Sequence, residues 1–283
     1  MTDVRTITVL GAGTMGHGIA HAAAASGFDT RLFDVNEAAL ARAREQVSAV
    51  FRKSVELGKT TAGDADAALA RLAMTSDIAE SLQDCDLIIE AAPERIDLKM
   101  RLMADIDRLA PADAVVATNT SALSITEMAG SIGNPARVAG MHFFNPVHKM
   151  KLIEIVRALE SSAGTLETIE AVARKMGKET VVVRESPGFI TSRVNASIGN
   201  EAFYMLMEGV ASARDIDKAL KLGLNHPMGP FELVDLVGLD TRLSILEYLH
   251  KSLGEKYRPC PLLAQYVKAG RLGKKVGRGV YEY

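Results

Sequence analysis

A histidine and a glutamate are the first pair of side chains in this sequence that could perform chemistry together. His142 follows a short apolar run, residues 137–141, and Glu154 interrupts a second apolar run, residues 152–156. A carboxylate inside an apolar strand must be paired or neutral, because burying it alone costs several kcal/mol. If a turn between the two runs brings them side by side, Glu154 meets His142. A histidine held by a glutamate in this way predicts a general base.

The same two residues also allow an ordinary structural interpretation. Glu154 could face solvent at a sheet edge, and His142 could be a core residue whose ring nitrogens are satisfied by neighbours. Taken alone, the pair leaves both interpretations open. The surrounding elements therefore have to decide between them.

A glycine-rich stretch near the start of the chain predicts a dinucleotide site. The β-branched run 6–10 precedes the sequence GAGTMG at 11–16, and a helical stretch, 17–26, follows it. In this order the glycines allow a tight turn and a close approach to a pyrophosphate, while the helix N-terminus faces the phosphate charge. The alternative is a glycine-rich turn that binds no nucleotide. The expected cofactor contacts in this stretch are Gly11, Gly13, Thr14, Met15 and Gly16.

An acidic residue ends the next apolar run, 30–33, and bears on the identity of the cofactor. Asp34 stands where an acid accepts hydrogen bonds from the hydroxyls of an adenine ribose. Its charge would repel a 2′-phosphate, and Arg31 precedes Asp34 instead of following it. The sequence therefore predicts NAD rather than NADP.

Polar residues also follow two later strands of the pattern. Glu94 comes shortly after the run 87–89, and Asn119 and Ser121 follow the run 114–118. Loop residues at the carboxyl ends of parallel strands face the ligand crevice, so we expect these three near the cofactor. Glu94 and Lys99 could equally be a capping pair at the start of a helix.

Basic residues gather at the end of a long expected helix, residues 36–57. Arg52 and Lys53 lie in its last turns and Lys59 lies just beyond. Such charges usually form a solvated helix face, but a cluster of this kind could also meet a phosphorylated substrate.

The element pattern predicts two domains. Strands and helices alternate over residues 1–185, which indicates an α/β fold with a Rossmann-type, doubly wound and mainly parallel sheet. From residue 186 onward only helical periodicity is present. We therefore expect an NAD-binding domain over 1–185 and a smaller all-helical domain for substrate binding and dimerisation over 186–283.

The totals exclude several classes of protein. The 283 residues carry a formal net charge of −2, which gives no electrostatic footprint for nucleic acid. No run approaches membrane-spanning length. Cys85 and Cys260 have no metal-like spacing, and His17 with His21 lacks a third ligand, so no metal site is expected. We expect a soluble cytoplasmic protein.

With these motifs in view, the chain resembles the L-3-hydroxyacyl-CoA dehydrogenases, and among them the short 3-hydroxybutyryl-CoA dehydrogenases. The resemblance runs nearly from end to end. Its motifs are GAGTMGHGIA at 11–20, EAAPE at 90–94, NTSALSI at 119–125, GMHFFNPVHKMKLIEIV at 140–156, SPGFI at 186–190, LGLNHPMGPFELVDLVGLD at 222–240 and GRGVYEY at 277–283. It implies NAD-linked interconversion of (S)-3-hydroxyacyl-CoA and 3-oxoacyl-CoA.

The resemblance also implies roles for individual residues. His142 would take the proton of the 3-hydroxyl, Glu154 would orient its imidazole, and Ser121 would hydrogen-bond the substrate hydroxyl. Asn145, Glu94 and Lys99 match residues that line the cofactor site, and Asn145 would also lie near the substrate. The family meets the phosphates of coenzyme A in the region of Arg52, Lys53 and Lys59, although individual positions there do not align cleanly.

One position departs from the family pattern. Where the family usually has asparagine before arginine, near the thioester carbonyl, this chain has Ser192 before Arg193. Serine keeps a hydroxyl donor but is shorter, so a bridging water or Asn195, three residues on, could compensate. We expect activity to persist, with Ser192 as a secondary catalytic residue.

Two other functions stay open at this point. The chain could oxidise a 3-hydroxy acid or sugar acid that lacks coenzyme A, or it could be a non-catalytic NAD-binding homologue. We also expect a homodimer through the helical domain, because the apolar helices over 231–239 and 243–249 exceed what a small domain needs to bury.

Overall fold

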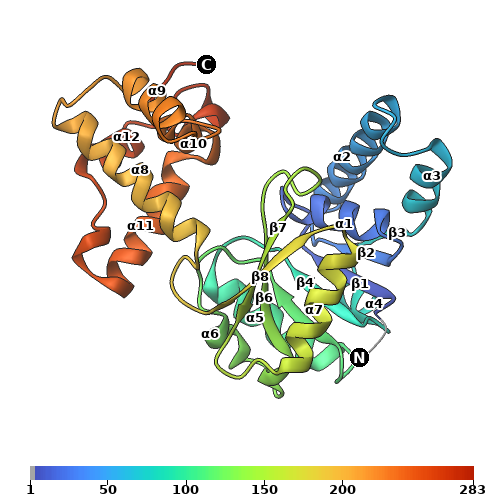
Figure 1. Ribbon diagram of the computed structural model, residues 1–283. Coiled ribbons are helices and arrows are strands. Elements are labelled where there is room, and N and C mark those ends of the chain that lie inside the picture. The colour runs from blue at the N-terminus through green and yellow to red at the C-terminus, as the bar shows by residue number, and fades with distance from the viewer. Residues whose placement is uncertain (1–3) are drawn as a thin grey trace. The chain divides into compact units, whose positions relative to one another are not determined.

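The computed structural model describes residues 4–283, whose contacts group into two compact units. The first unit ends at Glu185, and the second runs from Ser186 to Tyr283. Figure 1 shows a sheet with its helices in the first unit and only helices and loops in the second, orange-to-red one. The predicted fold class is confirmed: a mainly parallel Rossmann-type sheet, followed by a smaller all-helical part.

An eight-stranded sheet forms the centre of the first unit. Its strands lie in the order β3-β2-β1-β4-β5-β6-β7-β8, and every neighbouring pair is parallel except β6 with β7. In chain order the strands are β1 (Thr6–Leu10), β2 (Asp29–Phe33), β3 (Leu72–Thr75), β4 (Leu87–Glu90), β5 (Val115–Thr118), β6 (Val138–Phe143), β7 (Leu152–Arg157) and β8 (Glu179–Arg184). The order changes direction between β1 and β4, where doubly wound sheets bind their ligands at the carboxyl ends.

Helices cover both faces of this sheet. One apolar core joins the sheet to α1 (Gly16–Ala25), α2 (Glu37–Glu56), α3 (Ala62–Ala70) and α7 (Ala163–Lys175). The helices α4 (Ile78–Leu82), α5 (Ile96–Leu109) and α6 (Ile125–Ala129) form a second group: α5 contacts both others, α4 contacts the strands β2 and β3, and α6 contacts β6. A short 3-10 turn, η1 (Pro135–Arg137), leads into β6. Strand residues that alternate with those of the first core face the second group of helices instead: the hydroxyl of Thr8 donates to the carbonyl oxygen of Ser81 in α4, and Gly140 abuts Ile125 of α6. The two groups of helices therefore form layers on opposite faces.

The second unit is a helical bundle around its own core. It contains α8 (Thr191–Met207), α9 (Ala213–Gly223), α10 (Pro230–Val237), α11 (Leu239–Leu253) and α12 (Pro261–Lys268), with the 3-10 turns η2 (Glu255–Tyr257) and η3 (Lys274–Val276). Phe203 of α8 and Phe231 of α10 meet edge to face at the centre, with ring centroids 5.2 Å apart. Leu239, Leu246 and Leu249 are fully buried in the same core.

This packing overturns the premise on which the dimer expectation was based. Most of the large apolar residues of 231–239 and 243–249 pack in or against the bundle's own core. On α10 only Leu236 and Val237 are large exposed apolar residues, at 52% and 42% exposure. The other large exposed aliphatic side chains near them in sequence are Val210, Leu222 and Leu224.

The helices α2 and α9 begin where the local sequence indicates a cap, whereas the strand β3 does not follow a local sequence signal. Asn36 caps α2 by accepting hydrogen bonds from the backbone N–H groups of Ala38 and Ala39, and Ser212 caps α9 through the N–H of Asp215. The helix α3 stops at Ala70, and Leu72 begins the edge strand β3.

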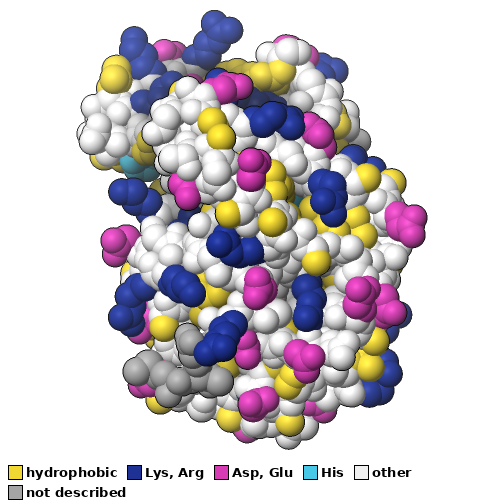
Figure 2. Space-filling model, turned by 90° about the vertical axis from the view of Figure 1, so that its right-hand side faces the viewer, with side chains coloured by type: hydrophobic (Ala, Val, Ile, Leu, Met, Phe, Trp, Pro, Cys, Tyr) yellow, Lys and Arg dark blue, Asp and Glu magenta, His cyan; other side chains and the backbone are white. Residues whose placement is uncertain are grey.

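The surface carries charges of both signs. Figure 2 shows Lys and Arg side chains interspersed with Asp and Glu on the face in view, in keeping with the net charge of −2. Within residues 4–283, the helices are all too short or too polar to cross a membrane.

Candidate functional site

His142 and Glu154 face each other across the one antiparallel strand pair of the sheet. His142 on β6 is in direct register with Glu154 on β7, and the Nδ1 atom of the histidine lies 2.7 Å from a carboxylate oxygen of the glutamate. Glu154 has no exposed surface, and His142 is 4% exposed. Because a carboxylate only accepts hydrogen bonds, we assign the ring proton to Nδ1. The Nε2 atom is then the ring nitrogen that can accept a proton.

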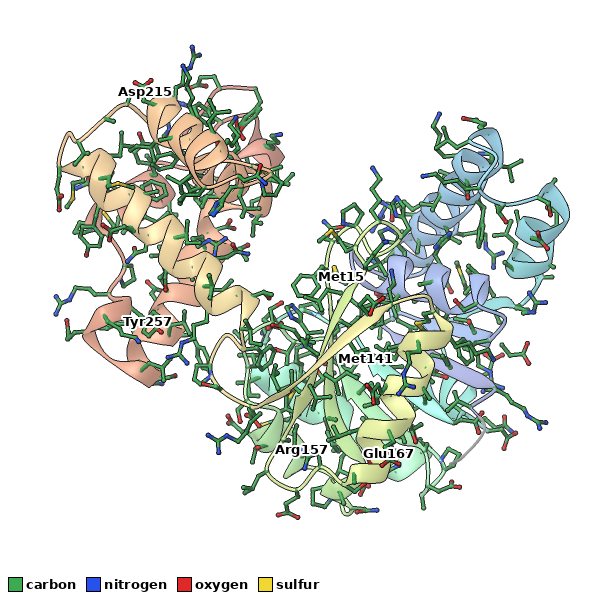
Figure 3. All side chains as sticks on the ribbon, viewed as in Figure 1. Met15, Met141, Arg157, Glu167, Asp215 and Tyr257 are labelled. Atoms are coloured by element: carbon green, nitrogen blue, oxygen red, sulfur yellow. The ribbon has the colours of Figure 1, made fainter. Side chains whose placement is uncertain are left out.

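Strand alternation explains why these two polar side chains share a face. Met141 and Phe143 point into the core that β6 shares with α7, so His142 between them points to the opposite face. Figure 3 labels Met141 in the middle of the sheet. On β7, Ile153 and Ile155 likewise enter the core and leave Glu154 opposite His142. The apolar alternation therefore sets the register of the pair.

Ser121 completes a chain of three hydrogen-bonded side chains. It follows β5, and its Oγ atom lies 3.1 Å from Nε2 of His142. Its backbone N–H donates to Glu94 at 2.9 Å, and the hydroxyl of Thr120 donates to the same carboxylate oxygen at 2.6 Å. His142 and Glu154 lie on β6 and β7, and Ser121 lies in the loop after β5, which Glu94 fixes.

Asn119 and Asn145 flank this group in different ways. The side-chain oxygen of Asn119 accepts a hydrogen bond from the backbone N–H of Phe143 at 2.9 Å, which ties the end of β5 to the end of β6. Asn145 is exposed in the loop between β6 and β7 and precedes a cis peptide bond to Pro146. Asn119 is thus engaged with backbone, while Asn145 is open to a ligand.

The glycine-rich loop has the geometry that the sequence predicts. Gly11 has a φ of +107°, and a Cβ atom added to it would lie 2.8 Å from the carbonyl oxygen of Ala91. A Cβ atom on Gly16 would lie 1.7 Å from the carbonyl oxygen of Gly11, so α1 can start this close to the turn only with glycine. A Cβ atom on Gly13 would meet no neighbour within 4 Å. Gly13 therefore leaves its side of the loop open for a ligand.

Asp34 holds this loop as well as standing at the expected ribose position. One carboxylate oxygen accepts the N–H of Ala12 at 2.8 Å, and the other accepts the N–H of Asn36 at 2.9 Å. Thr14 and Met15 lie just before α1, exposed and half-buried respectively, and Figure 3 labels Met15 there. The remaining lone pairs of Asp34 are available to ribose hydroxyls.

Lys99 sits differently from what its expected cofactor contact requires. It is 1% exposed, and its Nζ atom donates to both oxygens of Glu90, at 2.7 and 2.8 Å, and to the carbonyl oxygen of Ala92 at 3.2 Å. Glu94 lies 3.5 Å away with 43% of its side chain exposed. The alternative ion pair between Glu94 and Lys99 is thus present, while the N-cap residue of α5, Arg95, makes no side-chain cap hydrogen bond.

Sequence reasoning missed the part played by Glu90. This carboxylate ends the buried strand β4, is fully buried and receives four hydrogen bonds. The signal was present in the sequence, because a glutamate at the end of an apolar run needs a partner just as Glu154 does.

The basic residues at the end of α2 are exposed. Arg52 pairs with Glu45 at 2.6 Å and Lys53 pairs with Glu56 at 2.9 Å, both on the same helix. Lys59 is exposed beyond the helix end and is one of the positive charges that depress the pKa of His148, after burial and closer lysines. Arg52 and Lys53 would have to exchange their partners to bind a phosphate.

The histidines of α1 serve packing. One nitrogen of His17 lies 2.9 Å from the carbonyl oxygen of Gly13. The ring of His21 packs at a tilt against the ring of Phe51, with centroids 4.3 Å apart, and both of its nitrogens are buried without a hydrogen-bond partner. Burial, helped by His148 and His17, lowers the pKa of His21 to about 4. No group of three or more metal-ligating side chains occurs among residues 4–283.

Ser192 lies in the second unit, half-buried in the first turn of α8, and Asn195 is exposed one turn further on. Their spacing of three puts them on neighbouring faces of this helix, as the sequence indicates.

Comparison with known proteins gives this geometry a context. Residues 6–186 match the model of the 3-hydroxyacyl-CoA dehydrogenase NAD-binding domain, and residues 188–283 match the model of the C-terminal domain of the same enzymes. The chain belongs to the 3-hydroxyacyl-CoA dehydrogenase family. Its nucleotide loop, Asp34 and the Ser121–His142–Glu154 group all lie in the part that matches the family's NAD-binding domain.

Relatives in this dehydrogenase family match over almost their full length. A Bacillus subtilis protein named probable 3-hydroxybutyryl-CoA dehydrogenase is 46% identical in an alignment of 286 positions that covers 99% of this chain and 98% of that protein. The 3-hydroxybutyryl-CoA dehydrogenase of Bradyrhizobium diazoefficiens is 41% identical, covering 99% and 96%. The crystal structure of (S)-3-hydroxybutyryl-CoA dehydrogenase from Ralstonia eutropha aligns with a TM-score of 0.95 at 41% identity, over 99% of both chains.

Proposed function

We propose that this chain catalyses the reversible, NAD-dependent oxidation of (S)-3-hydroxyacyl-CoA to 3-oxoacyl-CoA, with 3-hydroxybutyryl-CoA as its substrate. The observation that carries the proposal is the hydrogen-bonded chain from Ser121 through His142 to Glu154 at the carboxyl ends of the central strands. The names of the relatives supply the substrate class.

Each of these three hydrogen-bonded side chains has a distinct part in the reaction. NAD, when bound, supplies the hydride acceptor. His142 accepts the proton of the 3-hydroxyl at Nε2 as the hydride leaves C3, and Glu154 stabilises the imidazolium that forms. The hydroxyl of Ser121 hydrogen-bonds the substrate oxygen and holds it near Nε2. In the reverse direction the imidazolium returns the proton to the oxygen of the reduced carbonyl.

Further contacts belong to this proposal. The glycine-rich loop with Thr14 and Met15, together with Asp34, Glu94, Asn119 and Asn145, surrounds the cofactor, and Asn145 also meets the substrate. Lys59, with Arg52 and Lys53 after a change of partner, binds the phosphates of coenzyme A. Ser192 hydrogen-bonds the thioester carbonyl. Lys99 acts from behind this site, since its ammonium group is already committed to Glu90.

Assembly and location are also proposed. We infer a homodimer through the second unit. The interface would bury the exposed apolar side chains of Val210, Leu222, Leu224, Leu236 and Val237. A monomeric mass in light scattering would contradict it. Both cysteines are free and buried, which suits a cytoplasmic enzyme.

The deciding experiment follows NADH absorbance with the purified protein, NAD and (S)-3-hydroxybutyryl-CoA. The (R)-thioester, the free acid and a longer acyl-CoA are run in parallel. We expect turnover of the (S)-thioester, abolished by His142→Ala and preserved by His250→Ala, a control in the second unit. Turnover of the free acid in preference to the thioester would support the alternative that Ser192 marks a change of substrate. NAD binding without turnover of any substrate would indicate a non-catalytic homologue.

A further inference from the structure

A buried ion pair lies behind the candidate site and is not used by the proposed reaction. Glu90, at the carboxyl end of β4, and Lys99, in the second turn of α5, are 0% and 1% exposed. The ammonium group lies 2.7 and 2.8 Å from the two carboxylate oxygens. A pair this deeply buried costs desolvation that its own attraction barely offsets, so stability alone is a weak reason for it.

The other hydrogen bonds of Glu90 fix its carboxylate in one orientation. The hydroxyl of Thr118 on β5 donates to one oxygen at 2.6 Å, and the backbone N–H of Ala92 donates to the other at 2.6 Å. The third proton of Lys99 reaches the carbonyl oxygen of Ala92 at 3.2 Å. The backbone N–H and the backbone C=O of Ala92 are therefore both held by this ion pair.

The turn after β4, residues 91–94, contacts the glycine-rich loop on one side. The N–H of Ala91 donates to the carbonyl oxygen of Leu10 at 2.8 Å, directly before Gly11. The carbonyl oxygen of Ala91 stands where a side chain on Gly11 would be, 2.8 Å from the position of a Cβ atom. A displacement of residues 91–92 would therefore displace the nucleotide loop.

On the other side the turn leads to Glu94 and from there to the reacting groups. Glu94 lies 3.5 Å from the ammonium group of Lys99, and its other oxygen accepts the N–H of Ser121 at 2.9 Å. Ser121 in turn contacts Nε2 of His142. Four consecutive contacts thus connect Glu90 to the proposed general base.

We propose that Glu90 is a positioning residue of this enzyme. Acting through Lys99 and the turn 91–94, it sets the glycine-rich loop against the cofactor and holds Glu94 where Glu94 fixes Ser121. The inference rests on the proposed function for its effect on turnover. Its effect on the cofactor can be measured without any substrate.

The test compares Glu90→Gln with the wild type in two assays. NADH binding is titrated by fluorescence with no thioester present, and kcat and KM are then measured for NAD and for (S)-3-hydroxybutyryl-CoA. We expect the Kd for NADH to rise about 10-fold and kcat to fall about 10-fold, with KM for the thioester within about 2-fold, because loss of a charge-assisted hydrogen bond to the turn is of that size. If the wild type binds NADH but turns over no thioester, the proposed function fails while the NADH titration still decides the role of Glu90.

Two further variants separate positioning from stability. Asp107→Asn is the matched control, since it cuts the ion pair to the 5%-exposed Arg137 at the amino end of β6. It should lower Tm and leave NADH affinity and kcat unchanged. Glu90→Gln/Lys99→Met removes both charges, and we expect it to recover Tm without recovering NADH affinity.

Thr118→Val keeps the ion pair and the side-chain shape but removes one hydrogen bond to Glu90. If Glu90→Gln does not fold, this variant takes its place. We expect the Kd for NADH to rise about 3-fold and kcat to fall about 3-fold. Unchanged NADH affinity and kcat in the folded variants, with only Tm lowered, would reduce the pair to a structural element and overturn the proposal.

Discussion

Nδ1 of His142 and a carboxylate oxygen of Glu154 lie 2.7 Å apart between residues in direct register on β6 and β7. Because these strands run antiparallel, both side chains emerge on the same face at the same level. The register places the carboxylate of Glu154 beside Nδ1 of the imidazole. It fixes the ring with Nε2 directed toward Ser121, 3.1 Å away.

Glu154→Gln should therefore slow turnover without preventing binding. The amide keeps the shape of the side chain but cannot stabilise the imidazolium, and it can present N–H where an acceptor is needed. We expect kcat to fall by about 10²-fold or more, within the range that general base catalysis contributes. KM for NAD should stay near the wild-type value in steady-state assays. Glu170→Gln, which loses a surface pair with Arg174, is the control; equal loss of activity in both variants would refute the prediction.

The carboxylate of Asp34 should decide between NAD and NADP. In Asp34→Asn the negative charge that repels a 2′-phosphate is lost, and one acceptor for the ribose hydroxyls is lost with it. We expect kcat/KM for NAD to fall about 10-fold and the preference for NAD over NADP to narrow. Asp29→Asn, at the exposed start of β2, the strand that leads to Asp34, should leave the ratio of the kcat/KM values for NAD and NADP unchanged. An unaltered ratio in Asp34→Asn would mean that another group selects the cofactor.

His21 should make the first unit sensitive to acid. Burial, with His148, His17 and Lys178 adding positive charge nearby, lowers the pKa of His21 from 6.5 to about 4. The unfolded chain thus takes up this proton first as the pH falls. Above pH 6.5 the free energy of unfolding keeps its full value with respect to His21. It has fallen by about 3 kcal/mol once the pH reaches 4. His148, whose pKa is also lowered, chiefly by desolvation, acts in the same direction.

Thermal unfolding between pH 7 and pH 4 measures this effect. His21→Gln should flatten the fall of Tm over that range, whereas His226→Gln, in a turn of the second unit, should not. Parallel Tm curves for the wild type and His21→Gln would assign the acid sensitivity to other groups.

Local signals account for most of what the sequence revealed of the fold. The apolar runs at β1, β4 and β5 are buried along their whole length or nearly so, and such runs are recognisable without tertiary information. The strand β3 could not be recognised, because only Leu72 of its four residues is buried. It is a strand through its pairing with β2, which no local pattern encodes. The partners of the apolar helices in the second unit were likewise a tertiary property.

The candidate site divides in the same way. Glu154 implied His142 because a lone carboxylate in an apolar strand demands a partner within reach of a turn. Glu90 made the same demand, but its partner is Lys99, on a helix whose packing the sequence does not specify. Lys99 was therefore expected at the cofactor, while its ammonium group is directed to the interior.

Ser192 provides the sharpest prediction about the substrate. If its hydroxyl donates to the thioester carbonyl, Ser192→Ala removes one neutral hydrogen bond, and KM for (S)-3-hydroxybutyryl-CoA should rise about 5-fold with KM for NAD unchanged. Ser192→Asn restores the residue usual in the family and should bind the thioester at least as well as the wild type. Because Asn195 lies one turn further along α8 and is exposed, it could take over the contact. Adding Asn195→Ala to Ser192→Ala should then raise KM beyond the product of the two single effects. Wild-type kinetics in both Ser192→Ala and the double variant would exclude the first turn of α8 from thioester recognition.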